Sequence, residues 1–201
     1  MNKDIYKRRR QELLNQIGEN DIVIVPTANV QSRNGDVYFR FRPDSDFYYL
    51  TGFEEPEAVM VICPARKQGP FIMFCRERDP FKEMWDGRRV GLEGAVEIYG
   101  ADDAFPIEDL DDILPSLMEE KVKVYNTVGR YSKFDTKLLE WMNRIKEGMR
   151  QGKHAPYEFV DLNHILHEQR LIKRKDEVDL MRKAGKMSAA GHMRAMGVCK
   201  P

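Results

Sequence analysis

Apolar residues along this chain follow two spacings, short β-branched runs and longer stretches with a helical period. Residues 21–26 form a β-branched run bounded by turn-forming residues, which is typical of a fully buried strand. Similar patterns predict further strands near 46–50, 58–63, 71–75 and 122–125. Because these strands alternate with helices and the early connections are short, we expect an α/β fold with a mixed β-sheet flanked by helices.

Several longer stretches carry apolar residues at helical spacing. Residues 5–17 combine such positions with many charges and predict an amphipathic surface helix that ends at Gly18. The basic run at 7–10 completes this pattern as a solvated helix face, which is favoured over a nucleic-acid patch. Helices are also predicted over 106–117 and 133–150, the second with one apolar side formed by Leu138, Leu139, Met142 and Ile145.

The end of the chain has a different composition. Residues 162–196 are almost entirely helix-forming apart from the basic break at 173–175. The second of the two implied helices starts near Asp176 and repeats apolar or small residues that no later element covers, namely Leu180, Ala184, Met187 and Gly191. We therefore expect this helix to begin a domain that continues past Pro201.

Composition narrows the function classes. The 33 basic and 33 acidic side chains balance, so no net field would attract nucleic acid or an anionic membrane. Two of the three cysteines fall in predicted buried strands, which favours a reducing, cytoplasmic location. The amino terminus opens onto a charged helix, and no apolar run approaches the roughly 18 residues of a membrane span. Neither secretion nor membrane insertion is expected.

Three side chains are candidates for contact with a ligand. Trp85 and Arg88 lie in a predicted loop beside Gly87, where they could form the wall or lid of a peptide site. Alternatively, Trp85 could plug the core while the arginines are solvated or paired with acids. Arg150 lies between glycines near a predicted helix end, where it could reach a carboxylate or simply favour the helix dipole.

Other polar clusters favour structural roles. His164 and His167 share a helix face, but they lack the spacing of zinc-binding helices, so a histidine packed at the domain junction is expected. The acids at 108–112 follow Pro106 at a predicted helix start, where they suit the helix dipole better than a metal-dependent nuclease site. The sequence holds no Gly-x-Ser-x-Gly elbow, Walker loop, dinucleotide fingerprint or Cys-x-x-Cys pair.

Two longer motifs resemble a known family. The string at 40–61, followed by the motif at 83–91, resembles the amino-terminal domain of the aminopeptidase P family, within the creatinase/prolidase superfamily. The resemblance extends through 167–173 and 182–185. Arg174 departs from it, because relatives usually place serine or another helix cap there, and this change would weaken the helix start by about 1 kcal/mol.

The resemblance implies both a domain plan and an activity. It implies a ribonuclease H-like, creatinase-type amino-terminal domain over 1–172 and the first long helix of a pita-bread catalytic domain over 173–201. The implied reaction is hydrolysis of the bond between an amino-terminal residue and a following proline. A water bridging two divalent ions, usually manganese, would attack, and the five metal ligands would lie beyond Pro201. No catalytic or metal-binding residue is therefore expected within this chain, which should be inactive alone.

The resemblance also implies partners, and it leaves alternatives open. Peptides with proline at the second position are the expected substrates, and a homodimer or homotetramer is the expected assembly. Trp85, Arg88 and Arg150 are the residues that would reach a peptide, including one in a neighbouring subunit's site. A prolidase or creatinase shares the same plan, although the motif at 49–52 and the Trp85 segment favour aminopeptidase P. A non-catalytic peptide- or protein-binding module of the same fold is the second alternative.

Overall fold

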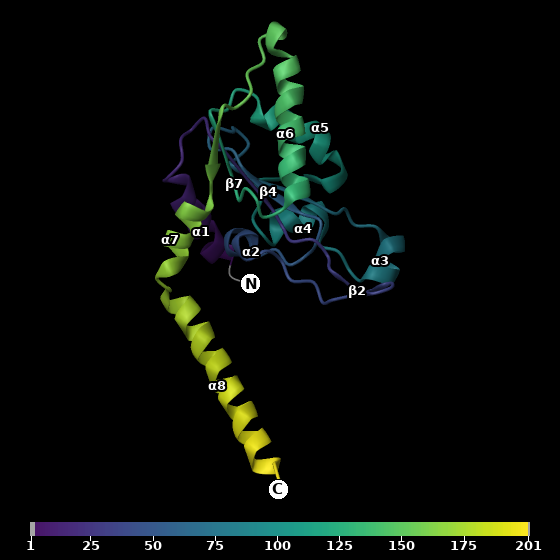
Figure 1. The fold of residues 1–201 in the computed structure, drawn as a ribbon, viewed down its shortest axis with the longest axis vertical. Helices are drawn as coiled ribbons and strands as arrows, with labels where there is room; N and C mark the ends of the chain where they lie inside the picture. The colour runs from purple at the N-terminus through teal and green to yellow at the C-terminus, as the bar shows by residue number, and fades with distance from the viewer. Residues whose placement is uncertain (1–2, 201) are drawn as a thin grey trace. The chain divides into compact units, whose positions relative to one another are not determined.

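The computed structural model describes residues 3–200, and a six-stranded mixed sheet forms the centre of the part before residue 163 (Figure 1). The strand order is β6-β5-β4-β1-β7-β8. The strands are β1 (Ile22–Pro26), β4 (Val59–Ile62), β5 (Phe71–Cys75), β6 (Asp103–Pro106), β7 (Lys123–Asn126) and β8 (Glu158–Asp161). β4 is antiparallel to β1 and β5, whereas the other neighbours are parallel. The predicted mixed α/β fold is confirmed.

Two helices cover one face of this sheet. α5 (Leu110–Met118) and α6 (Ser132–Glu147) pack their apolar sides against alternate residues of the central strands. On β1 these are Ile22 and Ile24, and every residue of this β-branched strand is buried. The predicted apolar side of α6 is correct at Leu138, Met142 and Ile145, but Leu139 is exposed and Trp141 is buried instead.

The aromatic segment at 46–50 is a helix, so the strand predicted there is wrong. α2 spans Ser45–Thr51, and its N-cap is Asp44, whose carboxylate accepts hydrogen bonds from the amides of Asp46 and Phe47. Gly52 ends the helix in the left-handed conformation at φ 68° and donates its N–H to the carbonyl of Tyr48. The two caps outweigh the preference of aromatic residues for strands. Phe47 and Leu50, one turn apart, are fully buried.

α1 (Lys3–Leu14) packs against α2, and its basic run is not wholly solvated as predicted. Arg9 and Arg10 are buried. Their guanidinium groups donate to the carbonyls of Tyr49 and Leu50 at 3.1 and 2.8 Å, in the last turn of α2. These carbonyls have no partner within the helix, and a cation near them also suits the helix dipole. The helix ends at Leu14, and Gly18 does not adopt the left-handed conformation expected of it.

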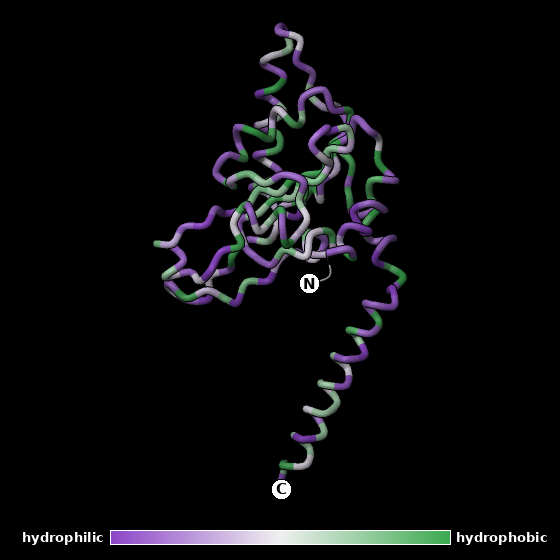
Figure 2. Tube along the Cα trace, turned by 180° about the vertical axis from the view of Figure 1, so that it is seen from behind, coloured by the Kyte–Doolittle hydropathy of each residue, from purple (hydrophilic) through white to green (hydrophobic). Residues whose placement is uncertain are grey.

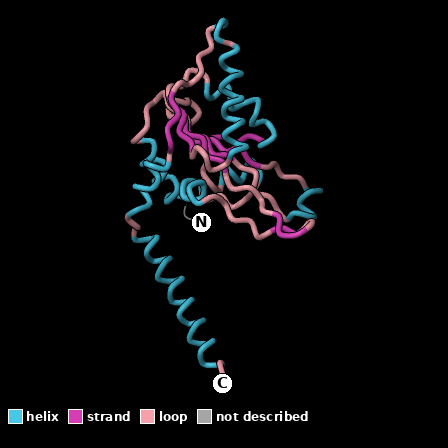
Figure 3. Tube along the Cα trace, in the orientation of Figure 1, coloured by secondary structure: helices cyan, strands magenta, loops and turns pink. Residues whose placement is uncertain are grey.

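Smaller elements lie outside the sheet. A hairpin of β2 (Ser32–Asn34) and β3 (Val37–Tyr38) extends from the same side of the domain as α3 (Pro80–Asp86), as Figure 3 shows. The remaining elements before residue 163 are α4 (Gly91–Glu97) and the short 3₁₀ turns η1 (Ile107–Asp109) and η2 (Met149–Gln151).

The chain divides into two units, Met1–Asn163 and His164–Pro201, each described by itself. The predicted domain boundary at 172/173 stays a prediction. The second unit holds most of α7 (Asn163–Leu171) and all of α8 (Lys175–Val198). The side chain of Glu177 accepts a hydrogen bond from the amide of Arg174 at 2.9 Å, so the helix start is partly capped without serine.

α8 has no buried residue, and hydrophilic and hydrophobic positions alternate along it in Figure 2. Its predicted stripe is exposed at Leu180 and Met187. Among the described residues, no helix is long and apolar enough to cross a membrane.

Candidate functional site

The helix α3 presents large apolar side chains to solvent. Phe81, Met84 and Trp85 are all exposed, Trp85 to 79 %, and no residue of α3 is buried. Trp85 therefore lies in a short helix rather than a loop, and it does not plug the core. A wide indole with a polar edge on an exposed tip is the kind of side chain that makes contacts with other molecules.

Local sequence explains why this tip is helical. The carboxylate of Asp79 accepts hydrogen bonds from the amides of Phe81 and Lys82 at 3.0 and 3.2 Å, and Pro80 occupies the first turn. Gly87, at φ 86°, ends the helix and donates its N–H to the carbonyl of Glu83. An Asp-Pro start and a glycine end thus bracket seven residues.

Ion pairs hold the base of the helix. Arg78 donates two hydrogen bonds to the carboxylate of Glu83, at 3.2 and 3.3 Å. This hydrogen bonding lowers the pKa of Glu83, so the carboxylate stays ionised near neutral pH. The buried Arg89 contacts Asp86 at 3.3 Å and also donates to the carbonyl of Glu77. The tip is therefore exposed but tethered at both ends.

Glu55 is a tether that sequence analysis missed. One carboxylate oxygen accepts a hydrogen bond from the amide of Val90 at 2.7 Å, and the other contacts Arg76 at 3.4 Å. Glu55 thus fixes the segment just after the α3 tip to the end of β5. Gly91, at φ 71°, lets the following backbone approach Arg78, because a Cβ there would lie 2.4 Å from Cγ of that side chain. No local pattern links Glu55 to a segment 35 residues away.

Arg88 is exposed, and no side chain in the described part of the protein pairs with it through a hydrogen bond or an ion pair. It lines a broad, shallow hollow of about 1020 Å³ together with Arg78, Pro80, Val90 and Glu93. Its five N–H donors are available to a ligand carboxylate or carbonyl.

Arg150 lies elsewhere. It is exposed in η2, and Figure 1 places that turn beyond the end of α6, well away from α3. The domain therefore brings Trp85 and Arg88 to one tip but does not bring Arg150 to them. A shared peptide contact for all three stays a prediction.

Of the acids at 108–112, Asp109 is the N-cap of α5 but makes no side-chain cap hydrogen bond, whereas Asp111 and Asp112 lie in the first turn of the helix. Asp111 accepts hydrogen bonds from Lys137 at 2.8 Å and from the indole N–H of Trp141 at 3.0 Å, and the Lys137 contact lowers its pKa. This acid thus joins α5 to α6. His164 and His167 are both exposed, and the histidine expected to pack at the domain junction stays a prediction. Residues 3–200 contain no group of three or more His, Cys, Asp or Glu side chains that could hold a metal ion.

Comparison with known proteins gives consistent results. Residues 6–125 match the family model of the aminopeptidase P, N-terminal domain. The chain is 34 % identical to the Xaa-Pro aminopeptidase of Escherichia coli over 98 % of its own length and 45 % of that protein.

Solved structures match along the whole chain. The structure of Pseudomonas aeruginosa aminopeptidase PepP has a TM-score of 0.98 at 52 % identity, over 100 % of this chain and 46 % of that one. A variant of Escherichia coli aminopeptidase P in complex with substrate has a TM-score of 0.95 at 33 % identity, with the same coverages. The chain spans less than half the length of these relatives. It belongs to the family of the aminopeptidase P amino-terminal domain.

Proposed function

We propose that this domain serves a metal-dependent Xaa-Pro aminopeptidase, which hydrolyses the bond between an amino-terminal residue and a following proline. The observation that supports the proposal is the match to Pseudomonas aeruginosa aminopeptidase PepP over the whole chain at 52 % identity. The Xaa-Pro aminopeptidase of Escherichia coli supports it independently by sequence. Substrates are peptides with proline second, and recognition depends on ring shape because the proline nitrogen carries no hydrogen.

The metal chemistry is proposed to lie outside residues 1–201. The described residues do not fit a pair of divalent ions, because they contain no suitable group of ligands. In the full-length protein the ions, manganese in our proposal, would be held by the region that the relatives have and this chain does not cover. We assign no catalytic step to any side chain described above.

The role proposed for this domain is to wall the cleft and to make subunit contacts in a cytoplasmic homodimer or homotetramer. Trp85 and Arg88 suit that role since they are exposed on a tethered tip. Arg150, on a separate part of the domain, would reach a different part of a peptide or of a subunit interface.

The proposal that the metal site lies outside residues 1–201 can be tested by comparing this chain with the full-length protein. Residues 1–201 should show no manganese-dependent cleavage of a Xaa-Pro peptide, whereas the full-length protein should cleave it at the Xaa–Pro bond. Product release is followed by chromatography, with and without a chelator. Cleavage by residues 1–201 alone would show that the active site lies within these residues, which contradicts the proposal. Failure of the full-length protein with every Xaa-Pro peptide would reject the activity itself.

The role of Trp85 is tested in the full-length protein. Trp85→Ala should reduce kcat/KM by roughly tenfold or more, as expected when a well-packed aromatic contact is lost, without loss of bound metal. Tyr157→Ala removes an equally exposed aromatic side chain from the segment before β8 and should leave the kinetics unchanged. Unchanged kinetics for Trp85→Ala, with metal content equal to wild type, would remove Trp85 from the site.

A further inference from the structure

A pocket lies at the carboxyl end of β1, where the strand order of the sheet reverses. β5, β6, β7 and β8 run in the same direction as β1, and β4 runs in the opposite direction. The carboxyl ends of these five strands therefore share one edge of the sheet. The chain builds β4 to β6 on one side of β1 and then crosses to β7 on the other. The carboxyl end of β1 is therefore a topological switch point, which is where open α/β sheets commonly bind ligands.

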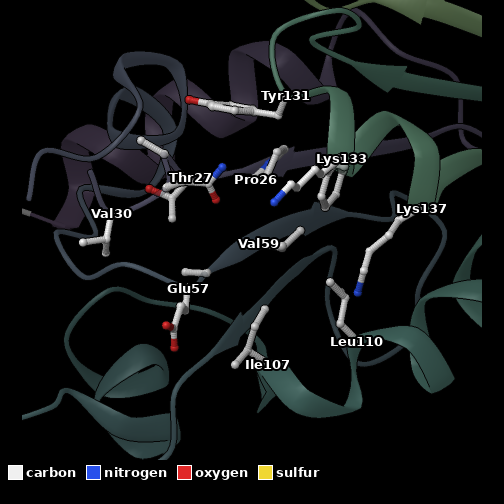
Figure 4. Close-up of a pocket in the computed structure, with 14 residues that line it drawn as sticks. Pro26, Thr27, Val30, Glu57, Val59, Ile107, Leu110, Tyr131, Lys133 and Lys137 are labelled. Carbon is white, nitrogen blue, oxygen red and sulfur yellow. The ribbon is translucent and has the colours of Figure 1, made fainter. Parts of the chain in front are cut away.

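The pocket beside Pro26, the last residue of β1, has a volume of about 340 Å³ (Figure 4). This volume lies at the low end of the range for small-molecule sites. Its apolar walls come from Val30, Val59, Ile107, Leu110 and Phe134. They suit an aliphatic or aryl group rather than a sugar or a nucleotide.

Thr27 places an unpaired polar group in this pocket. The residue is only 6 % exposed, and its hydroxyl has no hydrogen-bond partner. Its backbone is fixed, because its N–H donates to the carbonyl of Ala58 at 2.9 Å. A buried hydroxyl without a partner costs free energy that a bound acceptor would recover.

Lys133 adds a positive charge. It lies in the first turn of α6, and its ammonium extends over the pocket toward Pro26 in Figure 4. No hydrogen bond or ion pair to Lys133 occurs within residues 3–200, whereas Lys137 of the same helix pairs with Asp111. The start of α6 has no side-chain cap, so the helix dipole adds to the attraction for an anion.

We propose that this pocket binds a small carboxylate with an apolar body. The carboxylate would accept hydrogen bonds from the ammonium of Lys133 and the hydroxyl of Thr27, and the apolar body would fill the space beside Val59 and Leu110. The lining also includes Lys137 and Tyr131, which are already paired with Asp111 and Asp44, and the polar side chains of Asn29 and Glu57. Lys133 therefore supplies the unpaired positive charge, and the carboxylate of Glu57 disfavours a ligand with more than one negative charge. The apolar walls disfavour a bare inorganic ion as the preferred occupant.

The test uses the full-length protein and isocaproate, a branched aliphatic carboxylate, in saturation-transfer NMR titrations. Isocaproate should bind, and its neutral amide should bind at least about tenfold more weakly because the charge-assisted contact is lost. Lys133→Gln should lower the affinity for isocaproate by about tenfold or more, and Thr27→Val should lower it by about threefold or more. Lys133→Arg should retain binding.

The controls separate this site from general anion binding. Lys146→Gln, an exposed change in the last turn of α6, should leave the affinity unchanged. Thermal unfolding monitored by circular dichroism checks that each variant is folded. The proposal is overturned if isocaproate does not bind, if the amide binds equally well, if inorganic phosphate competes as effectively as isocaproate, or if a folded Lys133→Gln protein binds like wild type.

Discussion

Two cysteine thiols lie at strand ends inside the sheet. Cys63 directly follows β4, and Cys75 is the last residue of β5, and both are buried. Burial raises the pKa of Cys63 from 9.0 to about 11 and that of Cys75 to about 12. Both thiols therefore stay protonated near neutral pH and pack as small apolar groups, in line with their position in predicted buried strands.

These pKa shifts make stability depend on alkaline pH. Below pH 9 both thiols are protonated in folded and unfolded protein, so the stabilisation is fully present. Above pH 9 the unfolded chain releases these protons first, so the free energy of unfolding falls up to about pH 11 for Cys63 and about pH 12 for Cys75. We expect the free energy of unfolding of the double variant Cys63→Ala/Cys75→Ala, measured with urea across this pH range, to fall less than that of the wild type. The difference should be on the order of 2 kcal/mol per thiol. Parallel pH profiles for the two proteins would contradict the assignment.

Residue identity alone could not reveal the buried arginines. Arg9 and Arg10 belong to a basic run, and such runs usually form solvated faces. Here Arg9 also stacks 4.1 Å from the ring centre of Tyr49, and Arg10 lies 3.8 Å from that of Phe71. The carbonyl groups that accept these hydrogen bonds are 40 residues away in sequence. Because residues 46–50 were predicted as a strand, the free carbonyls at the end of a helix were not expected there.

At the scale of elements, one carboxylate stabilises two segments. One oxygen of Asp44 caps α2, while the other accepts hydrogen bonds from the hydroxyl of Tyr131 and from Arg130, each at 2.9 Å. Arg130 also contacts Asp46 at 2.7 Å. The segment after β7 is thereby joined to the start of α2, across more than eighty positions of sequence.

A double-mutant cycle tests this junction. Asp44→Ala should destabilise the domain by about 3 kcal/mol, because the cap and a buried ion pair are both lost. Tyr131→Phe should cost about 1 kcal/mol in the wild-type background and almost nothing once Asp44 is alanine. Urea unfolding gives both values. If Tyr131→Phe has the same effect in both backgrounds, the hydroxyl does not act through Asp44.

Local signals explain which elements were predictable. The buried strands were predicted well, because short β-branched runs bounded by turn-forming residues, such as Ile22–Val25, favour buried strands. Asp44 and Gly52 are helix-cap residues of α2, and Asp79-Pro80 signals the helix start before Trp85, but the prediction did not use these cap signals. The hairpin at 32–38 is exposed throughout and carries no apolar alternation to predict it.

The candidate site was predictable only in part. Trp85 and Arg88 were identified from their motif, and the structure places both on an exposed tip. The tether from Glu55 and the pocket at Thr27 and Lys133 depend on contacts between segments distant in sequence. Such contacts arise from strand order, which periodicity does not determine.

At the scale of the whole molecule, the two units differ in how they are stabilised. The first has a continuous core, whereas α8 buries no residue and contains three glycines, each unfavourable by about 1 kcal/mol relative to alanine. A helix without a packed face depends on propensity alone and is marginal in water.

Hydrogen exchange should reveal this difference. In residues 1–201 the amides of α8 should exchange nearly as fast as in a peptide, while those of β1 and β4 should exchange only on global unfolding. In the full-length protein we expect α8 to be protected, since a further domain would cover its apolar stripe. Equal protection of α8 and β1 in the short chain would show that the helix is stable without that cover.

The exposed tip at α3 has a consequence for how this protein behaves in solution. Since the core owes nothing to Phe81, Met84 or Trp85, lysine or glutamate at those positions would fold equally well and would improve solubility. Three large apolar side chains exposed to water are instead expected to favour self-association of the free domain. Burial of these side chains against another surface would remove that tendency, so light scattering of the domain would report whether the α3 tip is covered.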